Sequence, residues 1–287
     1  METKILIIVP FPMTESQLLN RREQSTKVKL NKNIELYYQP VKAAPRTFVS
    51  QEDYLIADVG ILEAGLKAQE EGYHAICIDT VSDSGVAALR SVLDIPVIGP
   101  GRTMFLTALM LGEKFSIITM WKEWFGLYYK TLTDLNMHKK CASIRSIDVV
   151  PDNRELLKGK ESDILPLLID ASKKCINEDG ADVICLGSTT MHQAGEFLSN
   201  ELPIPIINPG PLSYKLAETM LDVGLSHSKK AFPEPLAPKI SMIKAMLSLK
   251  GPVTSYITKK KIKKNLIILT MELLILTKIY LKIIKKM

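Results

Sequence analysis

The chain has few cysteines and no motif typical of a metal or nucleotide site. Its 287 residues include four Cys, which form no CxxC pair and show no metal-ligand spacing. No GxGxxG or P-loop sequence follows an expected strand. We therefore expect no disulfide framework, no metal site and no cofactor.

The sequence also lacks a secretory signal and a long uninterrupted apolar span. The apolar run at residues 5–9 is too short for a signal peptide and has no cleavage site. In the apolar C-terminal region, Glu272, Lys278 and Lys282 interrupt the roughly 20 apolar residues that a membrane helix needs. We expect a cytoplasmic protein.

Positive charge is concentrated at one end. The chain carries a net charge of +6, but residues 250–287 hold ten Lys and one Glu, so the preceding part carries −3. A mildly acidic body does not favour binding to nucleic acid. For the tail, 253–287, two interpretations stay open. Residues 259–287 form a basic apolar helix that contacts an anionic membrane surface or a partner, or the tail is an extension without a role.

One pattern occurs twice. Residues 72–101 read GYHAICIDTVSDSGVAALRSVLDIPVIGPG, and residues 180–210 read GADVICLGSTTMHQAGEFLSNELPIPIINPG. Each copy begins with Gly, contains an apolar run with a central Cys, and then reaches a hydroxyl residue, Thr80 or Ser188. A helical pattern and a second apolar run follow, and the similarity stops at a Pro-Gly pair in each copy. The period of 108 residues indicates a duplicated half rather than a solenoid.

Strands and helices alternate through both halves. The expected strands span 4–9, 33–38, 74–79, 95–98, 114–119, 142–150, 182–187 and 204–207, and the expected helices span 51–71, 83–93, 121–135, 162–178, 190–198 and 212–223. This order predicts an α/β protein with two similar Rossmann-like lobes, parallel sheets and pseudo-twofold symmetry. Lobe 1 is expected at 1–104, completed by 213–250, and lobe 2 at 105–212.

Ligands of open parallel sheets bind beyond the carboxyl ends of the strands. Thr80 and Ser188 follow equivalent strands in the two halves, so pseudo-twofold symmetry places them across one cleft. Cys77 and Cys185 lie three residues earlier, on the opposite strand face, where a buried structural role is favoured over catalysis.

The chain resembles the aspartate/glutamate/hydantoin racemase superfamily over about residues 1–235. The similarity is carried by the repeats, which end in IDTVSDSG at 78–85 and LGSTTM at 186–191, by IGPG at 98–101 and by SIIT at 116–119. The resemblance implies a ligand between two lobes. It also implies two opposed cysteines as acid and base, and here those positions hold Thr80 and Ser188. An aliphatic hydroxyl needs a strong partner base, so the two-cysteine mechanism is not supported.

Candidate substrate-binding groups cluster around the same strand ends. Hydroxyls and backbone N–H groups at a helix start favour an anion, although ordinary capping uses the same residues. Asp83 is either a cap or a base, and His192 either faces solvent or acts on Ser188 or the substrate. Trp121 or Trp124 could line the cleft, although core packing is favoured. His227, in the segment after the last expected helix, is a weak binding candidate. The expected binding residues are Thr14, Ser82, Asp83, Thr119, Thr189, Thr190 and His192.

We therefore expect an isomerase that acts on a small amino acid or carboxylic acid derivative, with Thr80 and Ser188 as the catalytic residues. Two alternatives stay open. One is a lyase or decarboxylase on the same scaffold, and the other is a protein that binds a small acid without turnover. The sequence leaves assembly into a homo-oligomer open.

Overall fold

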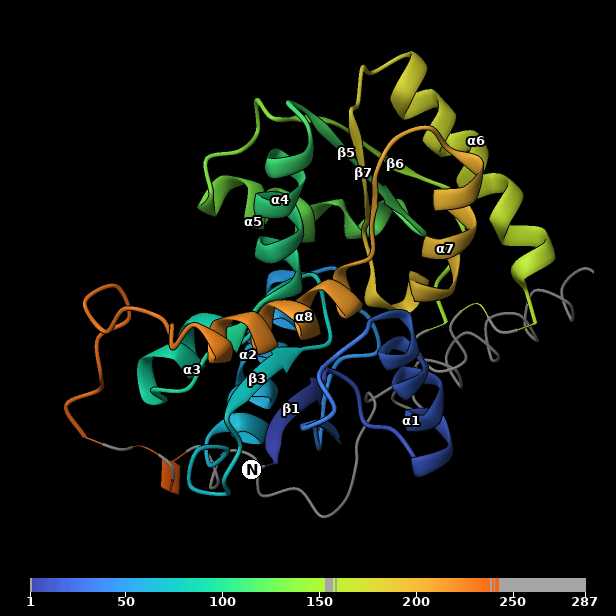
Figure 1. Cartoon of the computed structure of the whole chain (residues 1–287). Coiled ribbons are helices and arrows are strands. Elements are labelled where there is room, and N and C mark those ends of the chain that lie inside the picture. The colour runs from blue at the N-terminus through green and yellow to red at the C-terminus, as the bar shows by residue number, and fades with distance from the viewer. Residues whose placement is uncertain (1, 153–156, 158, 238, 240, 243–287) are drawn as a thin grey trace, which may run out of the picture. The chain divides into compact units, whose positions relative to one another are not determined.

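The protein contains two four-stranded parallel sheets flanked by helices (Figure 1). The computed structural model describes residues 2–152, 157, 159–237, 239, 241 and 242. The strands are β1 (Thr3–Val9), β2 (Ile34–Pro40), β3 (Ala75–Ile78), β4 (Val97–Ile98), β5 (Phe115–Thr119), β6 (Cys141–Ser146), β7 (Val183–Leu186) and β8 (Ile206–Ile207). The α-helices are α1 (Glu15–Arg22), α2 (Gln51–Gly65), α3 (Val86–Val92), α4 (Pro100–Leu111), α5 (Phe125–Asp134), α6 (Glu161–Asn177), α7 (His192–Glu201) and α8 (Pro209–Asp222). Three short 3-10 helices are η1 (Glu23–Lys27), η2 (Lys122–Trp124) and η3 (Thr189–Met191).

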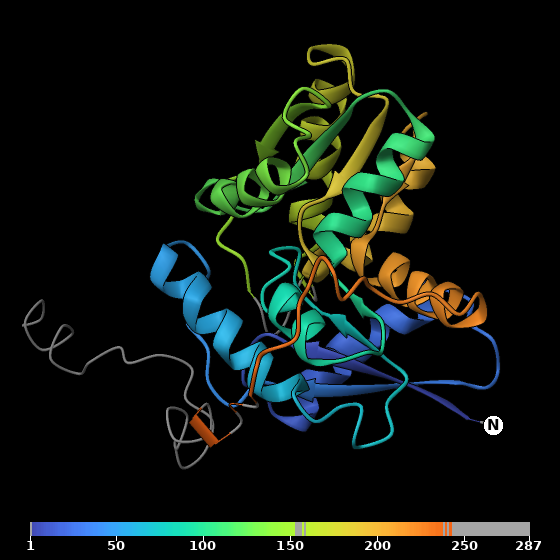
Figure 2. The same cartoon turned by 90° about the vertical axis from the view of Figure 1, so that its left-hand side faces the viewer.

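The two sheets have the same topology. Their strand orders are β2-β1-β3-β4 and β6-β5-β7-β8, and every neighbouring pair is parallel. We call the first sheet with its helices lobe 1, and the second sheet with its helices lobe 2. Figures 1 and 2 show them as separate blocks, lobe 1 in blue to cyan and lobe 2 in green to yellow. The expected fold class is confirmed.

The apolar runs form central strands that are covered on both faces. Ile5 and Ile7 pack against α8, whereas Leu6 and Ile8 face α2 and α3 on the other side of the sheet. All four side chains are fully buried. This double coverage explains why β1 is continuously apolar rather than alternating.

The Pro-Gly pairs at the ends of the two repeats begin helices. Pro100 lies in the first turn of α4 and Pro209 in the first turn of α8, where a missing backbone N–H breaks no helical hydrogen bond. The helix α4 was not expected at all. The carboxylate of Asp83 accepts hydrogen bonds from the backbone N–H groups of Gly101 (2.8 Å) and Arg102 (2.7 Å) at its start.

The chain returns to lobe 1 through α8. Tyr214 and Ala217 of this helix pack with Ile5, Ile7 and Cys77. Phe105 of α4 stacks on Phe115 of lobe 2, with ring centroids 5.1 Å apart. The division into 1–104, completed by 213–250, and 105–212 stays a prediction, and residues 238, 240 and 243–250 lie outside the described part.

The basic apolar tail, 253–287, lies outside the described residues. Within the described part of the chain, none of the helices has the length and apolar character required for a membrane span.

Candidate active site

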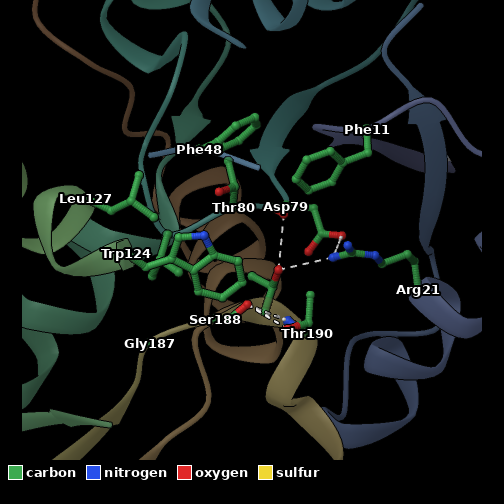
Figure 3. Close-up of a pocket in the computed structure, with 12 residues that line it drawn as sticks. Phe11, Arg21, Phe48, Asp79, Thr80, Trp124, Leu127, Gly187, Ser188 and Thr190 are labelled. Carbon is green, nitrogen blue, oxygen red and sulfur yellow. Dashed lines mark hydrogen bonds and ion pairs between the residues drawn. The ribbon is translucent and has the colours of Figure 1, made fainter. Parts of the chain in front are cut away.

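A pocket opens where the central strands of the two lobes end (Figure 3). In lobe 1, β3 leads into Asp79 and Thr80, and in lobe 2, β7 leads into Gly187 and Ser188. The space between the lining residues, including the open solvent at its mouth, is about 340 Å³. Twelve residues line the pocket: Phe11, Arg21, Phe48, Asp79, Thr80, Val81, Trp124, Leu127, Gly187, Ser188, Thr189 and Thr190.

Thr80 and Ser188 have similar surroundings. Each hydroxyl lies within hydrogen-bond distance of the hydroxyl two residues later, Ser82 at 3.1 Å and Thr190 at 2.8 Å. Both residues are buried beside the pocket. In the described part of the chain, neither hydroxyl is hydrogen-bonded to a carboxylate or an imidazole. No local base therefore converts either alcohol into a proton acceptor.

A buried ion pair forms one side of the pocket. Arg21 Nη1 lies 3.0 Å from Asp79 Oδ2, and both side chains are 1% exposed. Gln24 Nε2 donates to Asp79 Oδ1 at 3.1 Å. A carboxylate with donors on both oxygens is well compensated despite its removal from water.

Thr189 connects the two lobes at this ion pair. Its hydroxyl accepts a hydrogen bond from Arg21 Nη1 at 3.3 Å and donates one to the backbone carbonyl of Asp79 at 3.1 Å. Figure 3 shows Asp79, Arg21 and Ser188 around the same part of the pocket. Thr189, which directly follows Ser188 in lobe 2, therefore contacts Asp79, which directly precedes Thr80 in lobe 1.

Two opposing effects act on the acidity of Asp79. Burial raises the pKa of this carboxyl group, and the neighbouring Arg21 guanidinium and the hydrogen bond from Gln24 oppose the rise. Burial is the larger effect, so the pKa of Asp79 is raised from its ordinary value.

The remaining walls are mainly apolar. The rings of Phe11 and Phe48 stack with centroids 4.9 Å apart, and Leu127 and Trp124 lie on the lobe 2 side. Trp124 Nε1 is buried and has no hydrogen-bond partner among the described residues. In Figure 3 this nitrogen is on the edge of the indole that faces Thr80. A buried N–H without a partner is costly, so a ligand acceptor at this point is favoured.

Four of the predicted site residues line the pocket together: Thr80, Ser188, Thr189 and Thr190. Ser82 does not line it, but its hydroxyl connects those of Thr80 and Ser84. Asp83 caps α4, as described above, and burial raises its pKa to about 6. It is therefore a helix cap, but of α4 rather than of the helix that directly follows it.

The other predicted residues have structural contacts outside the pocket lining. Thr14 is exposed and forms a capping box with Gln17 at the start of α1. Thr119 is buried and lies 2.6 Å from the hydroxyl of Tyr128, which also donates to the Gly187 carbonyl. The His227 ring Nε2 lies 2.7 Å from the Leu93 carbonyl oxygen.

His192 begins α7 and is fully buried, rather than facing solvent or the pocket. Neither ring nitrogen forms a hydrogen bond with the described residues. Burial lowers the pKa of His192 to about 4, against a small opposing effect of the Thr189 backbone. The imidazole is therefore neutral near pH 7.

The four cysteines lie away from the pocket. Cys77 belongs to the apolar cluster between the first sheet and α8, and Cys185 to the core of lobe 2. Burial raises the pKa of both thiols. Neither supplies a thiolate near neutral pH. Among the described residues, no group of three or more His, Cys, Asp or Glu side chains is arranged to hold a metal ion.

Several pocket residues are not among the predicted ones. Arg21 lies in the last turn of α1, and the sequence contains no signal that would single it out. Asp79 carries a visible signal, because the equivalent position in lobe 2 is Gly187. For Trp124 the favoured interpretation was core packing, and its ring both packs in the core of lobe 2 and lines the pocket.

Comparison with known proteins gives a consistent family. The model of the Asp/Glu/Hydantoin racemase family matches residues 12–217. Hydantoin racemase of Pseudomonas sp. (strain NS671) is 28% identical over 220 residues, which are 76% of this chain and 86% of that protein.

Two solved structures show the same fold. Allantoin racemase from Klebsiella pneumoniae superposes with a TM-score of 0.74 at 24% identity, covering 83% of this chain and 95% of that one. A double mutant of arylmalonate decarboxylase in its liganded form gives a TM-score of 0.56 at 14% identity, covering 81% and 100%. The family match, supported by these similarities, establishes that the chain belongs to the Asp/Glu/Hydantoin racemase family.

Proposed function

We propose that this protein is an isomerase that removes and returns the proton on the carbon next to a carbonyl group in a small amino-acid derivative. One observation carries the proposal. Thr80 and Ser188, from equivalent positions of the two lobes, line the same small pocket. Family membership supports proton-transfer chemistry at this place, and the lining supplies hydroxyl and N–H donors for a developing enolate oxygen.

The charge of the pocket favours a neutral cyclic ureide of the hydantoin type over a free amino acid. A free amino acid brings an ammonium group, which needs a carboxylate partner. Among the pocket-lining residues the carboxylate is that of Asp79, and it is paired with Arg21. A ureide ring presents carbonyl oxygens and N–H groups and no full charge, which agrees with the apolar walls and the unpartnered indole N–H of Trp124.

We assign the lining residues in three groups. Phe11, Phe48 and Leu127 contact the flat faces and the substituent of the ring. Trp124 Nε1 donates to a ring carbonyl. The hydroxyls of Thr80, Ser188 and Thr190 share the charge that develops on the carbonyl oxygen when the neighbouring carbon loses its proton, and Thr189 holds the loop of Asp79.

The test uses 5-benzylhydantoin and allantoin as neutral ureides, L-aspartate and L-glutamate as free amino acids, and phenylmalonate as a decarboxylation probe. Loss of the α-proton in D2O is followed by NMR and optical rotation by polarimetry, each against a blank without enzyme. We expect exchange with at least one ureide. Thr80→Val and Ser188→Ala should each lower its rate by about 10- to 1,000-fold. The control Ser162→Ala changes an exposed hydroxyl at the start of α6.

Three outcomes would contradict this proposal. Turnover of aspartate or glutamate without ureide exchange would overturn the substrate class. Release of carbon dioxide from phenylmalonate as the main activity would favour a decarboxylase. Tight binding of a ureide without exchange by the wild type would indicate a binding protein.

We further propose a cytoplasmic location, with residues 259–287 in contact with anionic membrane surfaces, and assembly into a homo-oligomer. The excess of nine positive charges from residue 250 onward supports the membrane contact. Co-sedimentation with phosphatidylserine vesicles, compared with a chain that ends at residue 252, tests the tail. Analytical ultracentrifugation tests the assembly.

A further inference from the structure

We infer that Asp79 is the catalytic base of this site and that it acts alone, from the lobe 1 side of the substrate. The inference rests on the proposed function and assigns a residue to its proton transfer. It also changes the expected stereochemical course, because the family pattern of two opposed acid–base groups is replaced here by one.

The first argument is the composition of the pocket wall. Of the twelve lining residues, only Arg21 and Asp79 have side chains that are charged near neutral pH, and a guanidinium does not accept a proton. The remaining polar side chains are aliphatic hydroxyls and an indole. The buried thiols of Cys77 and Cys185 and the imidazole of His192 are not among the lining residues.

The second argument is the geometry of the carboxylate. Arg21 donates to one oxygen at 3.0 Å and Gln24 to the other at 3.1 Å. Each carboxylate oxygen has two acceptor positions, so one donor on each leaves capacity for a proton. The backbone carbonyl of Asp79 is held by Thr189 from the opposite lobe. The base is therefore fixed in place before a substrate binds.

The third argument is the asymmetry between the lobes. The position equivalent to Asp79 in lobe 2 is Gly187, which has no side chain. A side chain there would collide with Tyr128, because a Cβ on Gly187 would lie 2.6 Å from the Tyr128 hydroxyl oxygen. Of the two equivalent positions, only the one in lobe 1 therefore presents a carboxylate to the pocket, whereas both lobes present hydroxyls.

The reaction balances with this single group. The Asp79 carboxylate takes the proton from the ring carbon, and the C–H electron pair forms a double bond to the carbonyl carbon. The carbonyl electron pair moves to its oxygen, which accepts hydrogen bonds from the hydroxyls of Thr80, Ser188 and Thr190. Return of a proton from the Asp79 carboxyl to the same carbon restores the ring, and that proton is a deuteron if the carboxyl has exchanged with D2O.

A single base returns the proton mainly to the face from which it was removed. Inversion requires the enolate to turn over in the pocket or to be protonated from the Ser188 side. Exchange with retention should therefore be faster than racemisation. With two opposed bases, racemisation should be faster than exchange with retention. The product then carries the solvent deuteron, and the unreacted enantiomer keeps its proton.

The experiment follows one pure enantiomer of 5-benzylhydantoin in D2O with the full-length protein. Early in the reaction, we expect deuterium to enter the remaining starting enantiomer at least threefold faster than the mirror image forms, after subtraction of the blank. Asp79→Asn should lower exchange at least 100-fold. The matched control Asp179→Asn removes a carboxylate from the pair with Arg145, outside the pocket lining, and should leave exchange unchanged.

A second variant covers the case in which Asp79→Asn fails to fold. Gln24→Met removes the hydrogen bond from Gln24 to the Asp79 carboxylate, which stays paired with Arg21. The side-chain carbonyl oxygen of Gln24 forms no hydrogen bond with the described residues, so its removal breaks no further contact. This change should shift the rising limb of the exchange–pH profile to higher pH, because the ionised carboxylate loses a stabilising hydrogen bond. Gln39→Met, which removes a hydrogen bond to the Ala64 carbonyl in lobe 1, should leave the profile in place.

The outcomes separate this assignment from the proposed function. Wild-type exchange that persists in folded Asp79→Asn, or an unshifted profile in Gln24→Met, overturns the role of Asp79 and leaves the function standing. Inversion faster than exchange into the starting enantiomer overturns the single-base course. No wild-type exchange with either ureide overturns the function, and the assignment with it.

Discussion

The hydroxyl of Thr189 in lobe 2 donates a hydrogen bond to the backbone carbonyl of Asp79 in lobe 1, at 3.1 Å. The same hydroxyl accepts one from Arg21 at 3.3 Å. A single side chain from lobe 2 thus contacts both members of the buried ion pair of lobe 1. The Thr189 hydroxyl therefore contributes both to the contact between the lobes and to the position of Asp79, the proposed base.

Replacement of Thr189 should weaken the protein more than replacement of an exposed threonine. Thr189→Val keeps the shape but leaves the buried Asp79 carbonyl and one Arg21 N–H without this partner. The free energy of unfolding should fall by about 1–3 kcal/mol in urea denaturation. Thr133→Val, at an exposed site on α5, should cost less than about 0.5 kcal/mol. Equal losses in the two variants would contradict the interlobe role.

The buried imidazole of His192 should make stability depend on pH. Its pKa is lowered from 6.5 to about 4 in the folded chain, so the unfolded chain binds the proton more tightly. This contribution to stability is complete above about pH 6.5 and is lost as the pH falls toward 4, by about 3 kcal/mol at most. His192→Gln should remove that part of the decline. Urea denaturation at several pH values between 4 and 7.5 measures it, and parallel curves for wild type and variant would exclude it.

Trp124 offers a test that separates binding from stability. Trp124→Phe keeps an aromatic wall and removes the indole N–H, so kcat/KM for a ureide should fall by about tenfold. Loss of the indole N–H should change the free energy of unfolding little, because this group forms no hydrogen bond with the described residues. Trp121→Phe is the control, since Trp121 packs on the core of lobe 2 without lining the pocket. Similar losses of activity in both variants would argue against a hydrogen bond from Trp124.

The thiols should be inert in the folded protein. Cys77, Cys175 and Cys185 are buried, and Cys141 is partly buried with its pKa raised to about 12. A disulfide reagent should therefore label the native chain slowly, at Cys141 first, and all four thiols after unfolding in guanidinium. Cys141→Ala should abolish the first labelling event. Cys185→Ala should retain ureide exchange, and its loss in a folded variant would show that a thiol takes part in the reaction.

The sequence contained the main outline of the fold because strand burial leaves a local signature. Short, β-branched apolar runs such as residues 5–9 favour strands covered on both faces, and two such runs 110 residues apart predict two similar sheets. The helix α4, which begins at the first Pro-Gly pair, was not predicted. Pro is equally suitable for ending a strand and for the first turn of a helix, and the deciding contact, from Asp83 to the start of α4, joins residues 18 and 19 positions apart.

Local pattern alone placed Thr80 and Ser188 at the ends of equivalent strands, because parallel strands end at the same edge of a sheet. The charged side of the pocket depended on tertiary structure. Arg21 meets Asp79 across 58 residues and Thr189 across 168. Burial of such a pair requires partners for both charges, and these partners come from packing of segments that are far apart in the sequence.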